Sequence, residues 1–459
     1  MYKSRNLETS LMLVVKEIEN SRKSALNKYK SPLRYYDYYY RWYKFSLNYN
    51  KVFFEAAMES YKSFLGEKNK LVENRKIQNK MRGVFNSTLR KRLADDKVVS
   101  SLSELIESWL TVLKLLGGWK YYEVFSDFVS SRNRLFEPIR DNLNRTPSEV
   151  IKIEGRFKLH HYKSSAQKKH KTPLLVVYSL INRYYILDLT PKTSVVNNLL
   201  RQGFDVYATD WGIPDFYDKD MTLENYSHEY LEKAVEKIKE ITGSDKVSLF
   251  GYCWGGIFSL IYSCIHPENV KNLILHATPV DFGKEKGLVE TWTEHLDADN
   301  LVKTLGNVPG WFVNLAFVLR NPVEVFLKYF RYFSQPKSLE KILQFFWIET
   351  WLYDGRPIIG GVYREIVNEI CKNNFLIKNK MMVGPHKIDL RKITMPLLTI
   401  VGAKDYLVHP TSSKSIISAV GSNDKKLLEF PTGHVGLCIS EKAHELLWPE
   451  VGKWLAKRS

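Results

Sequence analysis

The chain has 459 residues, of which 44% are hydrophobic and 26% are charged, a composition that argues against global disorder and allows a sizeable core. Its net charge of +18 is uneven, because residues 1–100 carry 22 Lys and Arg against 10 Asp and Glu. A basic head suggests an anionic partner or surface, although solvated helix faces would explain the same lysines. No recognised nucleic-acid motif accompanies these charges, so we expect no nucleic-acid partner.

The cysteines and the N-terminus favour a reducing compartment. The four cysteines, at positions 253, 264, 371 and 438, form no CxxC pair, which argues against a zinc ribbon and a disulfide framework. The first ten residues, MYKSRNLETS, are not followed by an apolar core, so we expect no signal peptide and a cytoplasmic protein.

Residues 1–145 are predicted to form an N-terminal α-helical domain, because Leu-, Lys- and Glu-containing segments are long and glycine is rare. Within it, residues 31–50 read SPLRYYDYYYRWYKFSLNYN and place aromatic rings on several sides of one helix. Such a helix suits packing between two partners or a boundary between an apolar phase and water. A helical hairpin that buries the rings internally explains them equally well.

Residues 146–459 are predicted to form an α/β domain. A β-rich pattern begins at residues 151–163, and runs of Val, Ile and Leu then alternate with helical stretches, as in a parallel sheet covered by helices on both faces. The predicted parallel strands are residues 174–180, 204–210, 246–252, 270–278, 396–403 and 425–430. The helical and aromatic interval at about residues 281–388 lies between two of these strands, which predicts a cap inserted above the strand ends.

Residues 247–265, VSLFGYCWGGIFSLIYSCI, carry no charge and are long enough to span a membrane. We favour a buried strand, a tight turn and a buried helix, because FGYCWGG at residues 250–256 matches the turn called the nucleophile elbow. In this turn the central residue, here Cys253, is strained and exposed, and the flanking Gly251 and Gly255 leave room for the backbone. We therefore expect no membrane span.

Two further residues complete a triad in the chain order of α/β-hydrolases. Asp405 follows the predicted strand 396–403, and His434 follows the strand 425–430. His434 would take the thiol proton of Cys253, and Asp405 would orient the ring and stabilise the imidazolium. His409, four residues after Asp405, is a rival base.

The oxyanion hole of this fold uses the backbone N–H of the residue after the nucleophile, here Trp254. A second N–H comes from the loop after an early strand, and Ile181 in SLINRYY (residues 179–185) is the candidate. Cysteine at the elbow favours acyl transfer over ester hydrolysis, because forming a cysteine thioester from another thioester, such as an acyl-CoA, is nearly neutral in energy.

The box FGYCWGG resembles the modified lipase box of polyhydroxyalkanoate synthases, and other segments are similar in the same order. They include residues 173–191 with NRYYILDL, 203–212 with DWG, 270–282, 393–410 and 431–437, and they cover most of residues 145–459. The chain most resembles the class III type, whose catalytic subunit works with a separate helical partner subunit. Two features depart from that type: Trp254 is bulkier than expected after the nucleophile, and the helical region 1–145 is longer.

The resemblance implies an α/β-hydrolase fold with a helical cap, no metal and no cofactor. It implies that Cys253 accepts the acyl group, with Asp405 and His434 as its partners and (R)-3-hydroxyacyl-CoA, such as 3-hydroxybutyryl-CoA, as substrate. It also implies a homodimer, a polyester granule surface and, for the class III type, a helical partner subunit.

Two other functions stay open. A dienelactone-hydrolase-like enzyme also uses cysteine in such a box. That function predicts a compact chain, whereas Asp405 follows Cys253 only after 152 positions. A granule scaffold with a catalytically inactive hydrolase domain would explain the basic aromatic head, but an inactive domain would not need all three triad residues.

Overall fold

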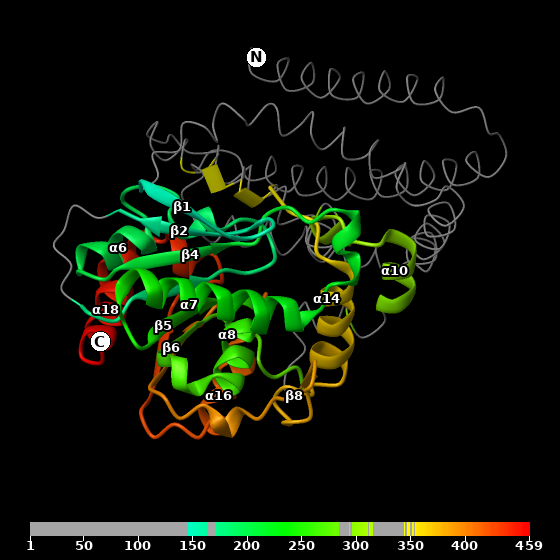
Figure 1. Ribbon diagram of the computed structural model, residues 1–459. Coiled ribbons are helices and arrows are strands. Elements are labelled where there is room, and N and C mark those ends of the chain that lie inside the picture. Colours follow the sequence, from blue (N-terminus) through cyan, green and yellow to red (C-terminus); the bar gives the residue numbers. More distant parts are fainter. Residues whose placement is uncertain are drawn as a thin grey trace, which may run out of the picture. The chain divides into compact units, whose positions relative to one another are not determined.

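The computed structural model describes residues 146–163, 170–283, 296–310 and 354–459, together with residues 293, 312–314, 344, 347–348 and 351–352 (Figure 1). The chain divides into two compact units, Met1–Gly117 and Gly118–Ser459, and every described residue belongs to the second. The predicted helical domain 1–145 and its aromatic segment lie outside the described residues, so they stay predictions. The same holds for the domain boundary at residue 145.

An eight-stranded sheet forms the centre of the described part, in the order β1-β2-β4-β3-β5-β6-β9-β10. Strands β4, β3, β5, β6, β9 and β10 run parallel, β2 pairs antiparallel with β4, and β1 pairs antiparallel with β2. The predicted parallel sheet is confirmed. The strands are β1 Ser148–Glu154, β2 Phe157–Tyr162, β3 Leu174–Val177, β4 Val206–Asp210, β5 Val247–Tyr252, β6 Val270–His276, β9 Leu397–Gly402 and β10 Lys425–Phe430.

The central strands are buried on both faces, which explains their unbroken apolar sequences. Every residue of β3, β5 and β9 is buried, whereas the edge strand β10 alternates between exposed and half-buried residues. On β5, Gly251 faces Gly256 of helix α8, and the neighbouring Phe250 packs against Trp448 of helix α18. Because successive side chains of a strand point to opposite faces, α8 and α18 cover opposite faces of the sheet.

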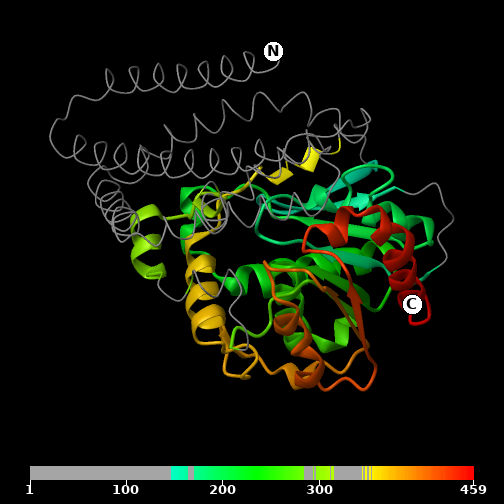
Figure 2. The same cartoon turned by 180° about the vertical axis from the view of Figure 1, so that it is seen from behind.

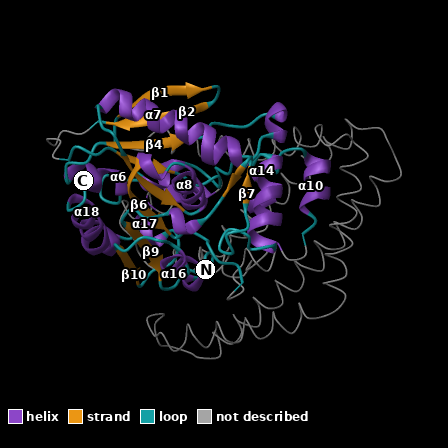
Figure 3. Cartoon of the chain, turned by 60° about the horizontal axis from the view of Figure 1, so that its bottom comes forward, coloured by secondary structure: helices purple, strands orange, loops and turns teal. Residues whose placement is uncertain are grey.

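The helices follow the strands in the alternating order that the sequence predicts. Helix α18 lies beside α6, as Figure 3 shows, and it comes to the front when the molecule is seen from behind (Figure 2). The helices of the sheet region are η1 Tyr184–Leu187, α6 Val195–Arg201, η2 Phe216–Asp220, η3 Asn225–Tyr230, α7 Leu231–Thr242, α8 Trp254–Ile265, η4 Pro267–Asn269, η6 Leu390–Lys392, α15 Pro410–Lys414, α16 Ile416–Ala419, α17 Gly436–Ile439, η7 Ala443–Leu447 and α18 Trp448–Ala456.

The interval between β6 and β9 holds the predicted cap insertion. Its described helices are α10 Ala298–Leu305, α14 Gly360–Glu365 and η5 Ile366–Lys372. A short antiparallel pair, β7 Met382–Val383 and β8 His386–Lys387, follows them and was not expected from the sequence. The limits of the insertion at about residues 281 and 388 stay a prediction.

The uncharged run 247–265 is the buried strand β5, the turn at Cys253 and the buried helix α8. Within the part of the chain that the structure describes, no helix has both the length and the apolar character needed to cross a bilayer.

Candidate active site

The predicted nucleophile Cys253 lies at the sharp turn between β5 and α8. Its backbone has φ 53° and ψ −119°, in a region that L side chains rarely adopt, so the turn is strained. A Cβ on Gly251 would lie 2.4 Å from Gly256 Cα, and a Cβ on Gly255 would lie 2.0 Å from the Val177 carbonyl oxygen. Neither glycine can accept a side chain unless the backbone moves.

Asp405 and His434 come from loops that follow the adjacent parallel strands β9 and β10, so both loops lie at the same edge of the sheet. His434 Nδ1 donates to Asp405 Oδ2 over 2.7 Å. The other carboxylate oxygen, Oδ1, accepts from the backbone N–H groups of Leu407 and Val408, each over 2.9 Å. These bonds hold the Asp405 carboxylate in one orientation.

The structure brings the three predicted triad residues together in a buried site. Cys253, Asp405 and His434 are exposed by only 6%, 4% and 8% of their surface, and Cys253 lies close enough to His434 to affect its charge. Burial alone lowers the pKa of His434, but the attraction of Asp405 and Cys253 outweighs burial and raises this pKa to about 10. The site therefore stabilises the imidazolium that forms when His434 takes a proton.

The rival base His409 has other contacts. It precedes helix α15, and its Nδ1 lies 2.8 Å from Thr411 Oγ1 and accepts a long hydrogen bond, 3.4 Å, from the Thr411 N–H. His409 therefore caps the start of α15, while His434 is the histidine that is bonded to Asp405.

The two predicted oxyanion donors lie in different surroundings. Trp254 is the first residue of α8, so its N–H has no acceptor four residues earlier within the helix. Ile181 lies in the loop after β3, and its N–H donates over 3.2 Å to Ser179 Oγ. The next residue, Asn182, is in the left-handed region with φ 60°. The Ile181 N–H would therefore have to exchange the serine hydroxyl for a substrate oxygen.

The bulky side chain of Trp254 packs beside the nucleophile. Its ring stacks on Phe282 with centroids 6.2 Å apart and planes 14° apart, and both side chains are buried. The Phe282 N–H donates to Asn374 Oδ1 over 3.1 Å, which fixes the position of this second ring. An aromatic pair thus borders the nucleophile.

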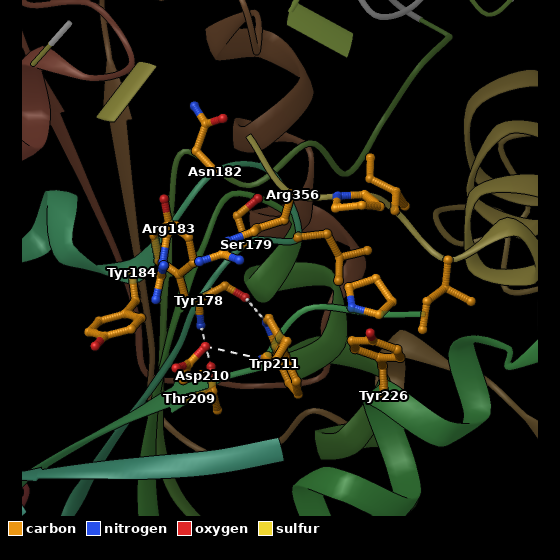
Figure 4. Close-up of a pocket in the computed structure, with 16 residues that line it drawn as sticks. Tyr178, Ser179, Asn182, Arg183, Tyr184, Thr209, Asp210, Trp211, Tyr226 and Arg356 are labelled. Carbon is orange, nitrogen blue, oxygen red and sulfur yellow. Dashed lines mark hydrogen bonds between the residues drawn. The ribbon is translucent and has the colours of Figure 1, made fainter. Parts of the chain in front are cut away.

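A small pocket, partly open to solvent, lies beside the loop that carries Ile181. Its lining residues are Tyr226 and members of three segments, namely 178–180 with 182–184, 209–212 with 214, and 356–359, so Ile181 itself does not line it. In Figure 4, Asn182, Arg183 and Arg356 lie in the upper half of the view, with Asp210 and Trp211 below them. Trp211 Nε1 donates to the Tyr178 carbonyl over 3.0 Å, which ties the end of β3 to the end of β4.

Trp351 and Asp354 lie within the predicted cap insertion and contact the loop of Ile181, a role that the sequence does not signal. Their segment, TWLYD, has no motif that signals this role, because the contacts join residues about 170 positions apart. Only the fold brings these residues together.

Two other cysteines are buried in the core, as expected for packing residues. Burial, with a smaller contribution from Asp389, raises the pKa of Cys264 to about 12, and burial also raises the pKa of Cys438.

Among the residues that the structure describes, no cluster of three or more His, Cys, Asp or Glu side chains is arranged to hold a metal ion.

Comparison with known proteins identifies the family. The profile of the alpha/beta hydrolase fold matches residues 172–438, and the profile of the poly-beta-hydroxybutyrate polymerase (PhaC) N-terminus matches residues 128–199. The poly(3-hydroxyalkanoate) polymerase subunit PhaC of Haloferax mediterranei is 37% identical over 345 residues, which cover 74% of this chain and 70% of the relative. The chain belongs to the PhaC family.

Other PhaC relatives agree. The PhaC subunits of Allochromatium vinosum and Synechocystis are 35% and 36% identical, over 68% of this chain and 89% and 85% of their own lengths. A putative lipase from Sulfolobus solfataricus shares 16% identity, with 68% of this chain and 99% of that chain covered and a TM-score of 0.45. The α/β-hydrolase fold expected from the sequence is confirmed, and membership of the PhaC family makes the chain an enzyme of the acyltransferase class.

Proposed function

We propose that the chain polymerises (R)-3-hydroxyacyl-CoA into polyhydroxyalkanoate and releases CoA, through an acyl-enzyme on Cys253. The observation that carries the proposal is the buried Cys253 at a strained elbow beside the hydrogen-bonded pair His434 and Asp405. The curated relatives, named poly(3-hydroxyalkanoate) polymerase, support the same reaction class.

The first step is acylation of the cysteine. Because His434 Nδ1 is bonded to Asp405, the other ring nitrogen, Nε2, accepts the proton of Cys253. The thiolate attacks the thioester carbonyl, and the resulting oxyanion accepts hydrogen bonds from the backbone N–H groups of Trp254 and Ile181. The bond from carbon to the CoA sulfur then breaks, and that sulfur takes the proton from His434.

The second step is transfer of the acyl group to an alcohol. The hydroxyl oxygen of another 3-hydroxyacyl unit attacks the carbonyl of acyl-Cys253, and His434 accepts the hydroxyl proton. As the bond to the cysteine sulfur breaks, this proton returns to the sulfur. Each cycle therefore forms one ester bond and restores the Cys253 thiol.

Substitutions at the nucleophile test this function. Purified full-length protein would receive 3-hydroxybutyryl-CoA, and free CoA and insoluble polyester would be measured together. We expect Cys253→Ala to abolish CoA release, and Cys253→Ser to retain little activity, because an oxygen ester is a poorer acyl donor. Polymer formed by the alanine variant at nearly the wild-type rate would refute the role of Cys253.

The same assay separates the two alternatives. A dienelactone-hydrolase-like enzyme would release CoA together with free hydroxy acid and no polymer, whereas a granule scaffold would release no CoA. Membership of the PhaC family argues against both alternatives.

We further propose that residues 1–100 attach the enzyme to its insoluble polyester or to a helical partner subunit, and that the protein works in the cytoplasm as a granule-bound homodimer. The support is the excess of positive charge in these residues and the aromatic rings of residues 31–50. Amphipathic rings prefer a boundary between an apolar phase and water, and neighbouring lysines face the wet side.

Replacing four head tyrosines by serine in the full-length chain tests this role: Tyr36, Tyr39, Tyr40 and Tyr43. We expect normal CoA release in dilute solution but reduced sedimentation with polyester granules. The matched control replaces Tyr217 and Tyr406, which are exposed by 89% and 71%, and it should sediment normally. Unchanged sedimentation of the four-residue variant, with or without a helical partner subunit, would refute the role.

A further inference from the structure

The loop that carries Ile181 is held by a distant segment, which we call the strap and define as residues 351–352 and 354–358. Trp351 Nε1 donates to the Arg183 carbonyl oxygen over 2.8 Å. The Tyr185 hydroxyl donates to Asp354 Oδ2 over 3.0 Å, and Arg183 Nε lies 3.9 Å from the same oxygen. Two side chains of the strap thus hold two residues of the loop on the C-terminal side of Ile181.

The strap also touches the loop at its most unusual backbone position. Asn182 has φ 60°, and a Cβ on Gly355 of the strap would lie 3.4 Å from Asn182 Oδ1. This oxygen is buried and has no hydrogen-bond partner among the described residues. The Asn182 side-chain oxygen therefore forms no hydrogen bond that would stabilise the left-handed turn.

The strap is anchored in the cap insertion at its other end. Ile358 and Val308 exchange two backbone hydrogen bonds, each 2.8 Å long, and Val308 lies shortly after helix α10 of the insertion. Figure 4 shows Arg356 of the strap near Asn182 and Arg183 at the pocket. A displacement of α10 would therefore be transmitted through Ile358 to the loop of Ile181.

The consequence for catalysis follows from the geometry that an oxyanion donor needs. A backbone N–H stabilises the developing charge only when it lies about 2.7–3.1 Å from the oxyanion, and loss of one donor typically costs 10²–10³-fold in kcat. The Ile181 N–H already has a competing acceptor, Ser179 Oγ, at 3.2 Å. A loop released from the strap could keep this internal bond instead of turning the N–H toward the substrate.

We propose that Trp351 and Asp354 are positioning residues, which fix the loop of Ile181 for oxyanion binding and thereby couple the cap insertion to catalysis. The proposal rests on the proposed acyl-transfer function. Neither residue needs to touch the substrate. Asp354 has the larger role, because one of its oxygens serves both Tyr185 and Arg183.

The test compares Asp354→Asn and Tyr185→Phe in the full-length enzyme. The matched control is Tyr262→Phe, which removes a buried tyrosine's hydrogen bond to a carboxylate, Glu232, away from the site. With 3-hydroxybutyryl-CoA, we expect kcat for CoA release to fall about 10- to 100-fold in Asp354→Asn and about 3- to 10-fold in Tyr185→Phe, with KM nearly unchanged. The control should keep the wild-type kcat.

Alkylation of Cys253 by iodoacetamide separates oxyanion positioning from general damage to the site. This displacement needs the thiolate but forms no oxyanion, so its rate, followed by mass spectrometry, should stay within about twofold of wild type. An unchanged kcat in both variants, or an alkylation rate that falls together with kcat, would overturn the proposal. If Asp354→Asn does not fold, the kcat and alkylation rate of Tyr185→Phe alone test the proposal. A wild-type enzyme that releases no CoA would overturn the proposed function itself, and this inference with it.

Discussion

The elbow and the loop of Ile181 follow two adjacent parallel strands, β5 and β3, but are held in place by different means. At the elbow, Gly251 and Gly255 allow close approach to the backbone of Gly256 and Val177, respectively. Cys253 is fixed by strand β5 before it and helix α8 after it. The loop of Ile181 has its own polar side chains, but it also donates a hydrogen bond to Asp354 and accepts one from Trp351.

This difference separates a rigid element of the site from an adjustable one. The elbow cannot move without moving strand β5, whose residues are all buried in the sheet. The loop can move whenever the strap moves. On the proposed function, such a division would keep the nucleophile and the Trp254 N–H in place while the Ile181 N–H responds to the cap.

The largest expected effect comes from breaking the elbow with Gly255→Ala. The new Cβ would meet the Val177 carbonyl oxygen at 2.0 Å, so the backbone must shift. We expect a loss of about 3 kcal/mol or more in the free energy of unfolding, and at least about a 100-fold loss of CoA release. Thermal melting and the CoA assay measure the two effects.

Gly155→Ala is the control for this substitution. Gly155 has a positive φ, 53°, which Gly255 lacks, but a Cβ there would meet nothing within 4 Å. We expect it to cost about 1 kcal/mol and to leave activity unchanged. A loss in Gly255→Ala no larger than in Gly155→Ala would show that the close approach to Val177 does not fix the elbow.

A second substitution, Asp405→Asn, keeps the elbow but removes the charge that faces His434. We expect CoA release to fall about 10²–10⁴-fold, because the imidazolium loses its stabilising partner. Asp424→Asn is the control, since this carboxylate pairs with Arg458 at the surface. If the asparagine variant elongated polymer normally while His409→Ala did not, His409 would replace His434 as the base.

The pH dependence of stability gives an independent measure of the same interaction. The pKa of His434 in the folded chain, about 10, is above the ordinary histidine value of about 6.5. The resulting stabilisation is complete below pH 6.5 and is lost as the pH rises toward 10. In Asp405→Asn, chemical unfolding should show a shallower decline over this range, and an identical decline would contradict the assigned attraction.

The smallest effect is expected in the adjustable region, at Asn182. Asn182→Gly keeps access to φ 60°, whereas Asn182→Ala places a less suited residue there, at a cost of about 1 kcal/mol. We expect the alanine variant to have the lower melting temperature and a kcat reduced a few-fold, with the glycine variant close to wild type. A glycine variant that lost as much activity as the alanine variant would give the Asn182 side chain a role of its own.

The rigid region is the part that the sequence predicted well. The strands are visible as unbroken apolar runs, the elbow as two glycines around a cysteine, and the proposed acid and base as single residues just after strands. These signals are local, because each depends on residues that are neighbours in the chain. The three residues then lie at one edge of the sheet because the strands that precede them are parallel.

The adjustable region could not be predicted in the same way. Trp351 is hydrogen-bonded to Arg183, and Asp354 to Tyr185. Each pair is separated by about 170 residues, and no periodicity or motif in the sequence predicts such a contact. The hydrogen bond from Ile181 to Ser179 also depends on how the loop folds, as does the balance of burial and attraction at His434. These features arise from tertiary packing.

One feature of the core, His276 on β6, bears on how the enzyme could be made more resistant to heat. The ring is fully buried against Phe250, Tyr252 and Trp448, and neither ring nitrogen has a hydrogen-bond partner among the described residues. A buried imidazole without hydrogen-bond partners lowers the free energy of unfolding, so a hydrocarbon ring of similar shape would suit the position better. For an engineer who needs a longer-lived polymer catalyst, position 276 is a place to improve, because a change of its ring keeps the backbone carbonyl that accepts the Cys253 N–H over 2.8 Å.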